Sequence, residues 1–175
     1  MLFHKLVTRA DISAVRQISE TIYDDVLDAI IIETQIQDIQ PLLGEFLFNS
    51  VMDTPNNFDD LLDGHAYTYS DFVFQNYGLK TVICFYVYAR LKMFGGVIDT
   101  PFSTIEKLEG ADSRPISDKT KKDLYQMNRD SAFKIWQSVQ NYLLRMETPE
   151  QELYLRTYPF TQKSSQTNMT ISKIE

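Results

Sequence analysis

The chain has 175 residues, enough for one domain with a substantial hydrophobic core and scarcely enough for two. Hydrophobic residues make up 43% of it, as in ordinary globular proteins, so the composition argues against wholesale disorder. The formal net charge of −7 and the pI near 4.8 argue against a dedicated DNA-binding protein, which usually carries a basic patch and a high pI.

The N-terminal region predicts a short helix. Thr8 followed by Asp11 fits a capping box, in which each of the two side chains accepts a hydrogen bond from a backbone N–H. The helix is therefore expected to begin at about residue 9 and to end near Ile18.

Residues 24–40 predict a longer amphipathic helix. Its apolar residues recur at spacings of three and four and form one stripe that faces the core: Ala29, Ile32, Ile36, Ile39 and Leu43. Pro41 is expected to end this helix, because proline lacks a backbone N–H, and to open the next one. Residues 41–53 then form a short helix with its own apolar face.

Residues 54–57 predict a turn, with Asn57 as the cap of a short helix that ends at Gly64. Residues 66–75 then alternate apolar and polar side chains on both sides of a turn, a pattern typical of a β-hairpin. Two strands alone are marginally stable, so this hairpin is expected to lean on the helices or on a partner.

Residues 79–94 are the most apolar stretch of the chain. They are too short, and carry too many charges, for a membrane span, which needs roughly twenty predominantly apolar residues. A strand is the rival interpretation, but the length without a turn residue favours a helix. Because the helix is apolar all round, other helices must enclose it. Cys84 lies inside it and is expected to be a small core residue.

Residues 95–117 include five Gly or Pro residues and show little helical periodicity, which predicts a long loop. Loops beyond about fifteen residues are usually functional or docked to something. Ser117 is then expected to cap a long amphipathic helix that ends at about Met146. The sequence as a whole predicts a mainly α protein: a helical bundle around residues 79–94, with a small β-hairpin, a long loop and an extended C-terminal tail.

The predicted tail, residues 149–175, is polar and follows a helical domain of residues 1–148. One interpretation is that it docks on a neighbouring subunit or another protein, for instance by adding a strand to a sheet edge. The other is that it folds back over its own helices. Spaced apolar residues are the predicted docking anchors: Tyr154, Tyr158, Phe160, Met169, Ile171 and Ile174.

The charge is unevenly distributed. Residues 17–79 contain twelve acidic residues and no Lys or Arg, whereas residues 80–175 contain fourteen basic and eleven acidic residues. This is typical of a solvated acidic face, or of an assembly in which acidic and basic surfaces meet. Under the second interpretation, nine residues are predicted to lie at subunit contacts or on a channel wall: Glu20, Asp24, Asp25, Asp28, Glu33, Asp38, Lys119, Lys121 and Lys122.

No sequence motif indicates an enzyme. The chain contains no nucleophile elbow, no phosphate-binding Gly-rich loop and no His-Glu-x-x-His. Its two histidines, His4 and His65, lack Cys or paired carboxylates at ligand spacing. We therefore expect no catalytic residue, no metal site and no cofactor.

Several landmarks resemble, in their order, the small head-completion or head-to-tail connector proteins of tailed bacteriophages. They are "QPLLGEFLF" (40–48), "LLDGHAY" (61–67), "YGLKTVICFYVYARLKMF" (77–94), "DTPF" (99–102) and "NYLLRM" (141–146). The resemblance spans about residues 9–146. It implies that the apolar helix is the centre of a small bundle, and that the hairpin and the long loop reach towards neighbouring subunits.

The resemblance also implies a non-enzymatic virion protein, made in the host cytoplasm. It implies a ring of twelve subunits, like the portal, between the portal and the tail. The partners are then the protein itself, the portal protein, other tail or ring proteins, and DNA that passes through the channel without sequence-specific binding; no membrane is involved. The alternative is a soluble intracellular helical adaptor or inhibitor of another protein.

Overall fold

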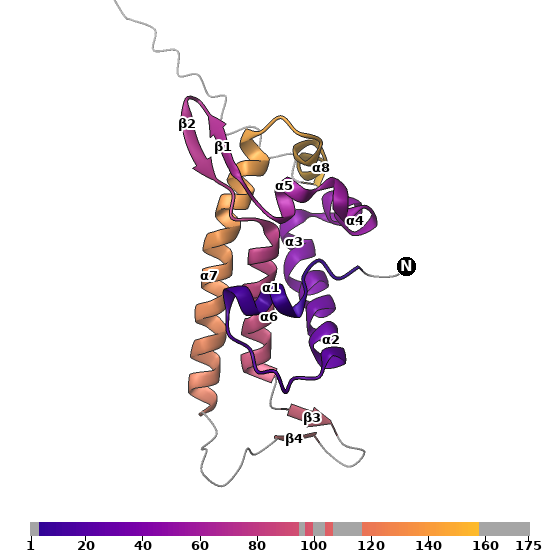
Figure 1. Ribbon diagram of the computed structural model, residues 1–175, viewed down its shortest axis with the longest axis vertical. Helices are drawn as coiled ribbons and strands as arrows, with labels where there is room; N and C mark the ends of the chain where they lie inside the picture. Colours follow the sequence, from indigo (N-terminus) through magenta and orange to yellow (C-terminus); the bar gives the residue numbers. More distant parts are fainter. Residues whose placement is uncertain (1–3, 95–96, 100–103, 107–116, 158–175) are drawn as a thin grey trace, which may run out of the picture.

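The computed structural model describes residues 4–94, 97–99, 104–106 and 117–157, and within them the protein is mainly helical, as predicted (Figure 1). The bundle is elongated along its two longest helices, with one hairpin projecting near one end. The elements are α1 (Arg9–Val15), α2 (Asp24–Thr34), the π-helical turn η1 (Gln35–Ile39), α3 (Gln40–Leu43), α4 (Glu45–Asp53), the 3-10 turn η2 (Pro55–Asn57), α5 (Asp59–Leu62), β1 (Ala66–Tyr69), β2 (Phe72–Gln75), α6 (Leu79–Phe94), β3 (Val97–Asp99), β4 (Thr104–Glu106), α7 (Asp118–Arg145) and α8 (Pro149–Thr157).

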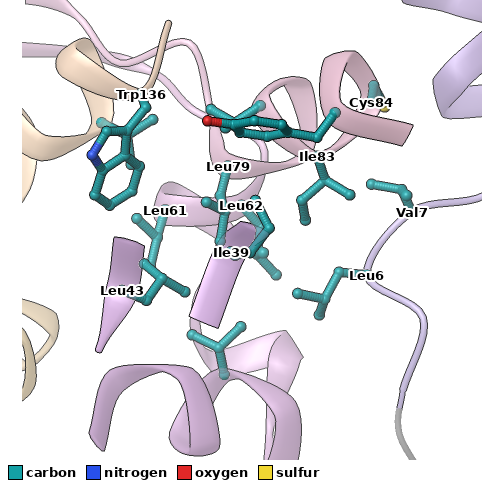
Figure 2. Close-up of a cluster of buried hydrophobic side chains, with 14 of the residues drawn as sticks. Leu6, Val7, Ile39, Leu43, Leu61, Leu62, Leu79, Ile83, Cys84 and Trp136 are labelled. Carbon is teal, nitrogen blue, oxygen red and sulfur yellow. The ribbon is translucent and has the colours of Figure 1, made fainter. Parts of the chain in front are cut away.

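The central helix α6 has the bounds that the apolar stretch predicts. It packs most extensively against α7, and also against α1 and α2. Nine of its sixteen residues are buried, so most of its circumference faces other elements. Figure 2 shows the core cluster, in which α6 side chains meet residues from the N-terminal segment, η1, α3, α5 and α7; the labelled residues are Leu6, Val7, Ile39, Leu43, Leu61, Leu62, Leu79, Ile83, Cys84 and Trp136.

Two helix starts follow their predicted caps. In α1, Thr8 Oγ1 accepts a hydrogen bond from the Asp11 backbone N–H at 3.4 Å, and Asp11 Oδ2 accepts one from the Thr8 N–H at 2.7 Å. In α7, Ser117 Oγ accepts from the Thr120 N–H at 3.2 Å. Helix α1 ends at Val15 rather than near residue 18, because the backbone of the next residue is extended.

The stripe predicted for residues 24–40 is partly wrong. Ala29 and Ile36 are exposed, whereas Ile39 and Leu43 are buried as predicted. The other buried residues of this stretch are Leu27, Ile31, Thr34, Gln35 and Asp38. The π-helical turn η1 widens the helix and rotates the residues that follow it relative to those before it. Pro41 does not end the helix, which continues through α3 to Gly44 (φ 76°).

Polar side chains occupy part of the buried face of residues 24–40 because their polar atoms are hydrogen-bonded there. Gln35 Oε1 accepts a hydrogen bond from the Leu6 N–H at 2.8 Å, and its Nε2 donates to the His4 carbonyl oxygen at 2.9 Å. The amide thus holds the N-terminal segment against the bundle. A fully buried Gln whose donors and acceptor are satisfied in this way carries little desolvation cost.

The hairpin has the predicted strands and a two-residue turn. Tyr67 pairs with Phe74 and Tyr69 with Phe72, so these four aromatic side chains lie on one face of the sheet. Ser70 and Asp71 form the turn with φ values of 49° and 66°, the left-handed pair that a type I′ hairpin turn needs. The helix before the hairpin is capped differently from the prediction: Phe58, which is buried, occupies the N-cap position rather than Asn57.

Two further predictions need correction. The stretch predicted as an irregular loop contains β3 and β4, which pair antiparallel. Residues 149–157, predicted to belong to an extended tail, form α8, which packs on α4 and α7, so the boundary at 148/149 does not separate tail from bundle. Composition misled here, because Tyr154 is deeply buried and Leu153 and Leu155 pack beside it against the core.

The core predicts a loss of stability at alkaline pH. Burial raises the pKa of Tyr142 from 10.0 to about 12 and that of Cys84 from 9.0 to about 12. Between pH 9 and 12 the unfolded chain loses these protons while the folded chain keeps them, so stability present below pH 9 falls as pH rises. We expect the urea midpoint to drop across this range, and to drop less steeply in Tyr142→Phe.

Candidate functional site

The most elaborate polar site of the bundle is centred on Arg90, which lies in the last turns of α6. Its Nε donates to Asp38 Oδ2, its Nη1 to Glu33 Oε1 and its Nη2 to Gln37 Oε1, each at 2.8 Å. The Arg90 side chain is 8% exposed and that of Asp38 4%. The guanidinium thus joins the central helix to the end of α2 and to η1.

A second arginine completes the site from α7. Arg129 Nη1 donates to Asp38 Oδ1 at 2.6 Å and to the Tyr125 hydroxyl at 3.1 Å, and its guanidinium lies over the rings of Tyr86 and Tyr125. Burial lowers the pKa of Arg129, but the hydrogen bond and the charge of Asp38 outweigh this and leave it raised. Two carboxylates face two guanidinium groups, so the charges balance and the arrangement is a structural link between four elements, α2, η1, α6 and α7.

Four of the six acidic residues predicted for subunit contacts are paired within the chain. Asp24 lies 2.7 Å from Arg9 Nη2, Asp28 is paired with Lys5, and Glu33 and Asp38 bind Arg90. For Asp38 the prediction is wrong, because a buried carboxylate can line neither a channel nor a subunit contact. The basic partners of Asp38, Arg90 and Arg129, lie 52 and 91 residues away in the sequence, so the local excess of acidic residues does not show that Asp38 is paired.

The remaining charged residues of the prediction stay near the surface. Glu20 and Asp25 are exposed, as are Lys119 and Lys122 at the start of α7, whereas Lys121 is largely covered and lies 3.9 Å from Asp118. These residues do not form one cluster with a common partner. Their role at a contact or a channel wall stays a prediction.

The described residues contain neither a cluster of metal-ligating side chains nor a membrane-spanning helix. Among the described residues, no three His, Cys, Asp or Glu side chains lie close enough together to hold a metal ion. A shallow hollow beside α1 is lined by Arg9 and Asp24, whose side chains bind each other. No helix of the described chain is both long and apolar enough to cross a membrane.

The hairpin is anchored at its base and exposed at its tip. Its inner half is anchored: Tyr67 is buried, packs edge-on against Tyr142 at 5.3 Å between ring centroids, and lies close to Phe74. Arg145 of α7 reaches across this inner half, with its guanidinium 4.2 Å from the centroid of Phe74. The same guanidinium lies 5.6 Å from the centroid of Tyr69, so this support reaches that residue, whereas Phe72 beyond it is 69% exposed.

The outer half of the hairpin is exposed on both faces. Phe72 is 69% exposed and Tyr69 43% on the aromatic face, and Val73 is 74% exposed on the opposite face. We call these three residues the hairpin tip. The sequence predicts the hairpin but not this surface, because alternation alone does not show how far the supporting helix extends along the strands.

Exposed apolar side chains also occur on the helices of the bundle. Met127 and Phe133 belong to α7, whereas Val26, Ile36 and Phe46 belong to α2, η1 and α4. Figure 1 shows α7 on one side of α6 and α2 and α4 on the other. Single exposed apolar residues are normal on a protein surface.

The predicted anchors of the tail divide into two groups. Tyr154 lies in the protein's own core, where its hydroxyl accepts a hydrogen bond from Gln140 Nε2 at 2.9 Å and its ring faces Trp136. The prediction that Tyr154 docks elsewhere is therefore wrong, since its side chain is already enclosed. The other predicted anchors lie outside the described residues: Tyr158, Phe160, Met169, Ile171 and Ile174.

Comparison with known proteins identifies a family but no activity. No curated protein and no solved structure matches the chain. The profile of a family of unknown function, DUF6712, matches residues 39–154, which run from the end of η1 through the hairpin, α6 and α7 into α8. The match covers well over half of the sequence, and the chain belongs to this family.

Proposed function

We propose that this protein is a non-enzymatic structural component of a tailed-phage particle. Copies of the chain form a ring between portal and tail, which seals the head and leaves a channel for the genome. It is made in the host cytoplasm and resides in the virion. The proposal starts from the resemblance of the ordered sequence landmarks to head-to-tail connector proteins.

The observation that supports the proposal is that exposed apolar side chains belong to elements on different sides of α6. Phe133 belongs to α7 and Phe46 to α4, and Figure 1 shows these two helices on opposite sides of α6, with the hairpin projecting near one end. A ring requires that one surface of each copy binds a different surface of the next copy. A compact bundle with a projecting hairpin suits such an arrangement, because the rigid part sets the angle and the projection reaches the neighbour.

The surface charge fits passage of DNA. Among the acidic residues predicted for contacts or the channel wall, Glu20 and Asp25 are the two that are exposed and have no Lys or Arg partner in the described chain. An acidic wall repels phosphates and therefore lets DNA move without binding it. We assign these two residues to the channel wall or to a subunit contact.

Native mass spectrometry of the purified protein, alone and with portal protein, tests this function. We expect rings, or a complex with portal. Glu20→Lys combined with Asp25→Lys should impair ring assembly or DNA passage and leave the helical circular dichroism signal unchanged, because both residues are exposed. Reversal of two exposed acidic residues outside the predicted set, Asp53→Lys with Glu147→Lys, is the matched control.

Two outcomes would contradict the proposal. A monomer that persists at high concentration, binds no portal and is absent from purified particles would favour the helical adaptor or inhibitor. Normal assembly and packaging by the Glu20→Lys, Asp25→Lys variant would mean that the acidic residues serve solubility alone.

A further inference from the structure

The hairpin is an incomplete sheet. It has two strands, each with an edge whose backbone groups have no strand partner within the described chain, and its tip carries exposed Tyr69, Phe72 and Val73. Sheets of two strands are marginally stable in water, and open edges next to exposed apolar side chains readily pair with another strand. The hairpin therefore fits an extended apolar segment.

Residues 158–175 of the chain, which lie outside the described residues, are polar overall but contain spaced apolar residues that could supply such a strand. Met169 and Ile171 are two positions apart, the spacing that places side chains on one face of a strand. Lys173 follows at the same spacing, and the hairpin turn presents exposed Asp71, which has no ion-pair partner among the described residues. Apolar pattern and charge both complement the hairpin.

We propose that the C-terminal segment of one copy lies along the hairpin of the next copy and adds a third strand to it. Met169 and Ile171 then lie on the aromatic face, beside whichever of Tyr69 and Phe72 borders the occupied edge. This inference rests on the proposed ring, and it names the contact that links one subunit to the next. Main-chain hydrogen bonds supply affinity in such an arrangement, and the alternate side chains supply specificity.

The position of Thr157 favours the neighbouring copy over the chain's own hairpin. Its side chain lies against Gly44, so close that a Cβ on Gly44 would be 2.4 Å from it, and α8 packs on α4. The described chain therefore ends beside Gly44 at the start of α4, whereas the hairpin rests on Tyr142 and Arg145 near the end of α7. Eighteen extended residues span about 60 Å, enough to reach another subunit. If the C-terminal segment of each copy binds the hairpin of the next copy, two different surfaces meet, and the contact is head-to-tail.

Disulfide cross-linking of the full-length chain tests this contact. In the added strand, residue 170 points to the face away from Met169 and Ile171. Thr68 and Val73 point to this same face of the hairpin. Thr170→Cys is combined with Val73→Cys for one sheet edge, and with Thr68→Cys for the other. The native Cys84 is buried and its pKa is raised to about 12, so it stays out of the reaction.

We expect one of these pairs to give a ladder of covalent multimers on a non-reducing gel, because each copy is linked to the next. Thr170→Cys with Val26→Cys is the matched control: it also replaces an exposed valine, in α2, and should give monomers. Ladder formation should also disappear when Met169 and Ile171 are both replaced by Ser in the cross-linking variant.

The outcomes separate this contact from the ring itself. Rings in native mass spectrometry without a ladder from either pair would overturn the tail contact and leave the ring standing. A cross-link confined to monomers would show that the segment binds its own hairpin, which overturns the contact between copies. A ladder in the Val26→Cys control equal to that of the test pairs would mean non-specific capture, and would overturn it as well.

Discussion

Replacement of Asp38 by Asn is expected to lower the free energy of unfolding by about 3–5 kcal/mol, the typical cost of breaking a buried ion pair from one side. Asp38 accepts hydrogen bonds from Arg90 and Arg129, and its side chain is almost fully enclosed. The Asn amide is nearly the same size but carries no charge, so Arg90 keeps a buried positive charge with only Glu33 to offset it. Urea unfolding followed by circular dichroism measures this loss.

Asp25→Asn is the matched control, because it makes the same chemical change at an exposed position in α2. Surface substitutions of this kind usually change stability by no more than about 0.5 kcal/mol. Asp38→Leu combined with Arg90→Met removes both buried charges, and should regain much of the stability lost in Asp38→Asn. Equal stability of the Asp38→Asn and Asp25→Asn proteins would show that the arginine site contributes nothing to the fold.

Local signals explain how far the sequence predicts this fold. The capping residues Thr8 and Ser117, the unbroken apolar run of α6 and the alternation around the hairpin turn each act over a few residues, and each predicts its element. In these stretches the pattern leaves one arrangement that buries the apolar side chains and satisfies the backbone.

The errors arise where residues far apart in sequence decide the outcome. Asp38 is separated from Arg90 by 52 residues and from Arg129 by 91, so no local pattern shows that this acid is buried. The same is true of Tyr154, whose burial depends on Trp136 and Gln140 of α7. The exposure of the hairpin tip could not be predicted either, because it depends on how far Arg145 of α7 reaches along the hairpin, which is to Phe74 and Tyr69.

A second large effect is expected at the neck of the hairpin, which we define as Gly64 and Gly78. Gly64 has a φ of 77°, and a Cβ there would lie 2.4 Å from both the Asn76 carbonyl oxygen and the Gly78 nitrogen. Gly78 has a φ of 80°, and its Cβ would lie 2.6 Å from the Leu62 carbonyl oxygen. In both cases the obstacle is backbone, which cannot rotate away as a side chain can.

Gly64→Ala should therefore lower the free energy of unfolding by roughly 2–4 kcal/mol, from the strained φ together with separation of the two backbones. The buried Asn76 is part of the same contact, since its Nδ2 donates to the Asp60 carbonyl oxygen at 2.9 Å and its Oδ1 accepts from the Gly78 N–H at 3.0 Å. Moving the backbone at Gly64 away from that at Gly78 weakens these hydrogen bonds too. Urea unfolding measures the loss, and Gly78→Ala should behave similarly.

Asp71→Gly in the hairpin turn is the control, because it introduces a glycine at a left-handed residue, whereas Gly64→Ala removes one. Asp71 has a φ of 66° and is exposed, so Asp71→Gly removes a Cβ from a left-handed residue without opening a cavity. Glycine is favoured at this position of a type I′ turn, and we expect a gain of about 0.5 kcal/mol after the entropy that glycine adds to the unfolded chain. If Gly64→Ala were as mild as Asp71→Gly, the neck would be able to open at little cost. The hairpin would then be a loosely hinged arm, and a fixed contact with a neighbouring subunit would have to come from the partner rather than from the fold.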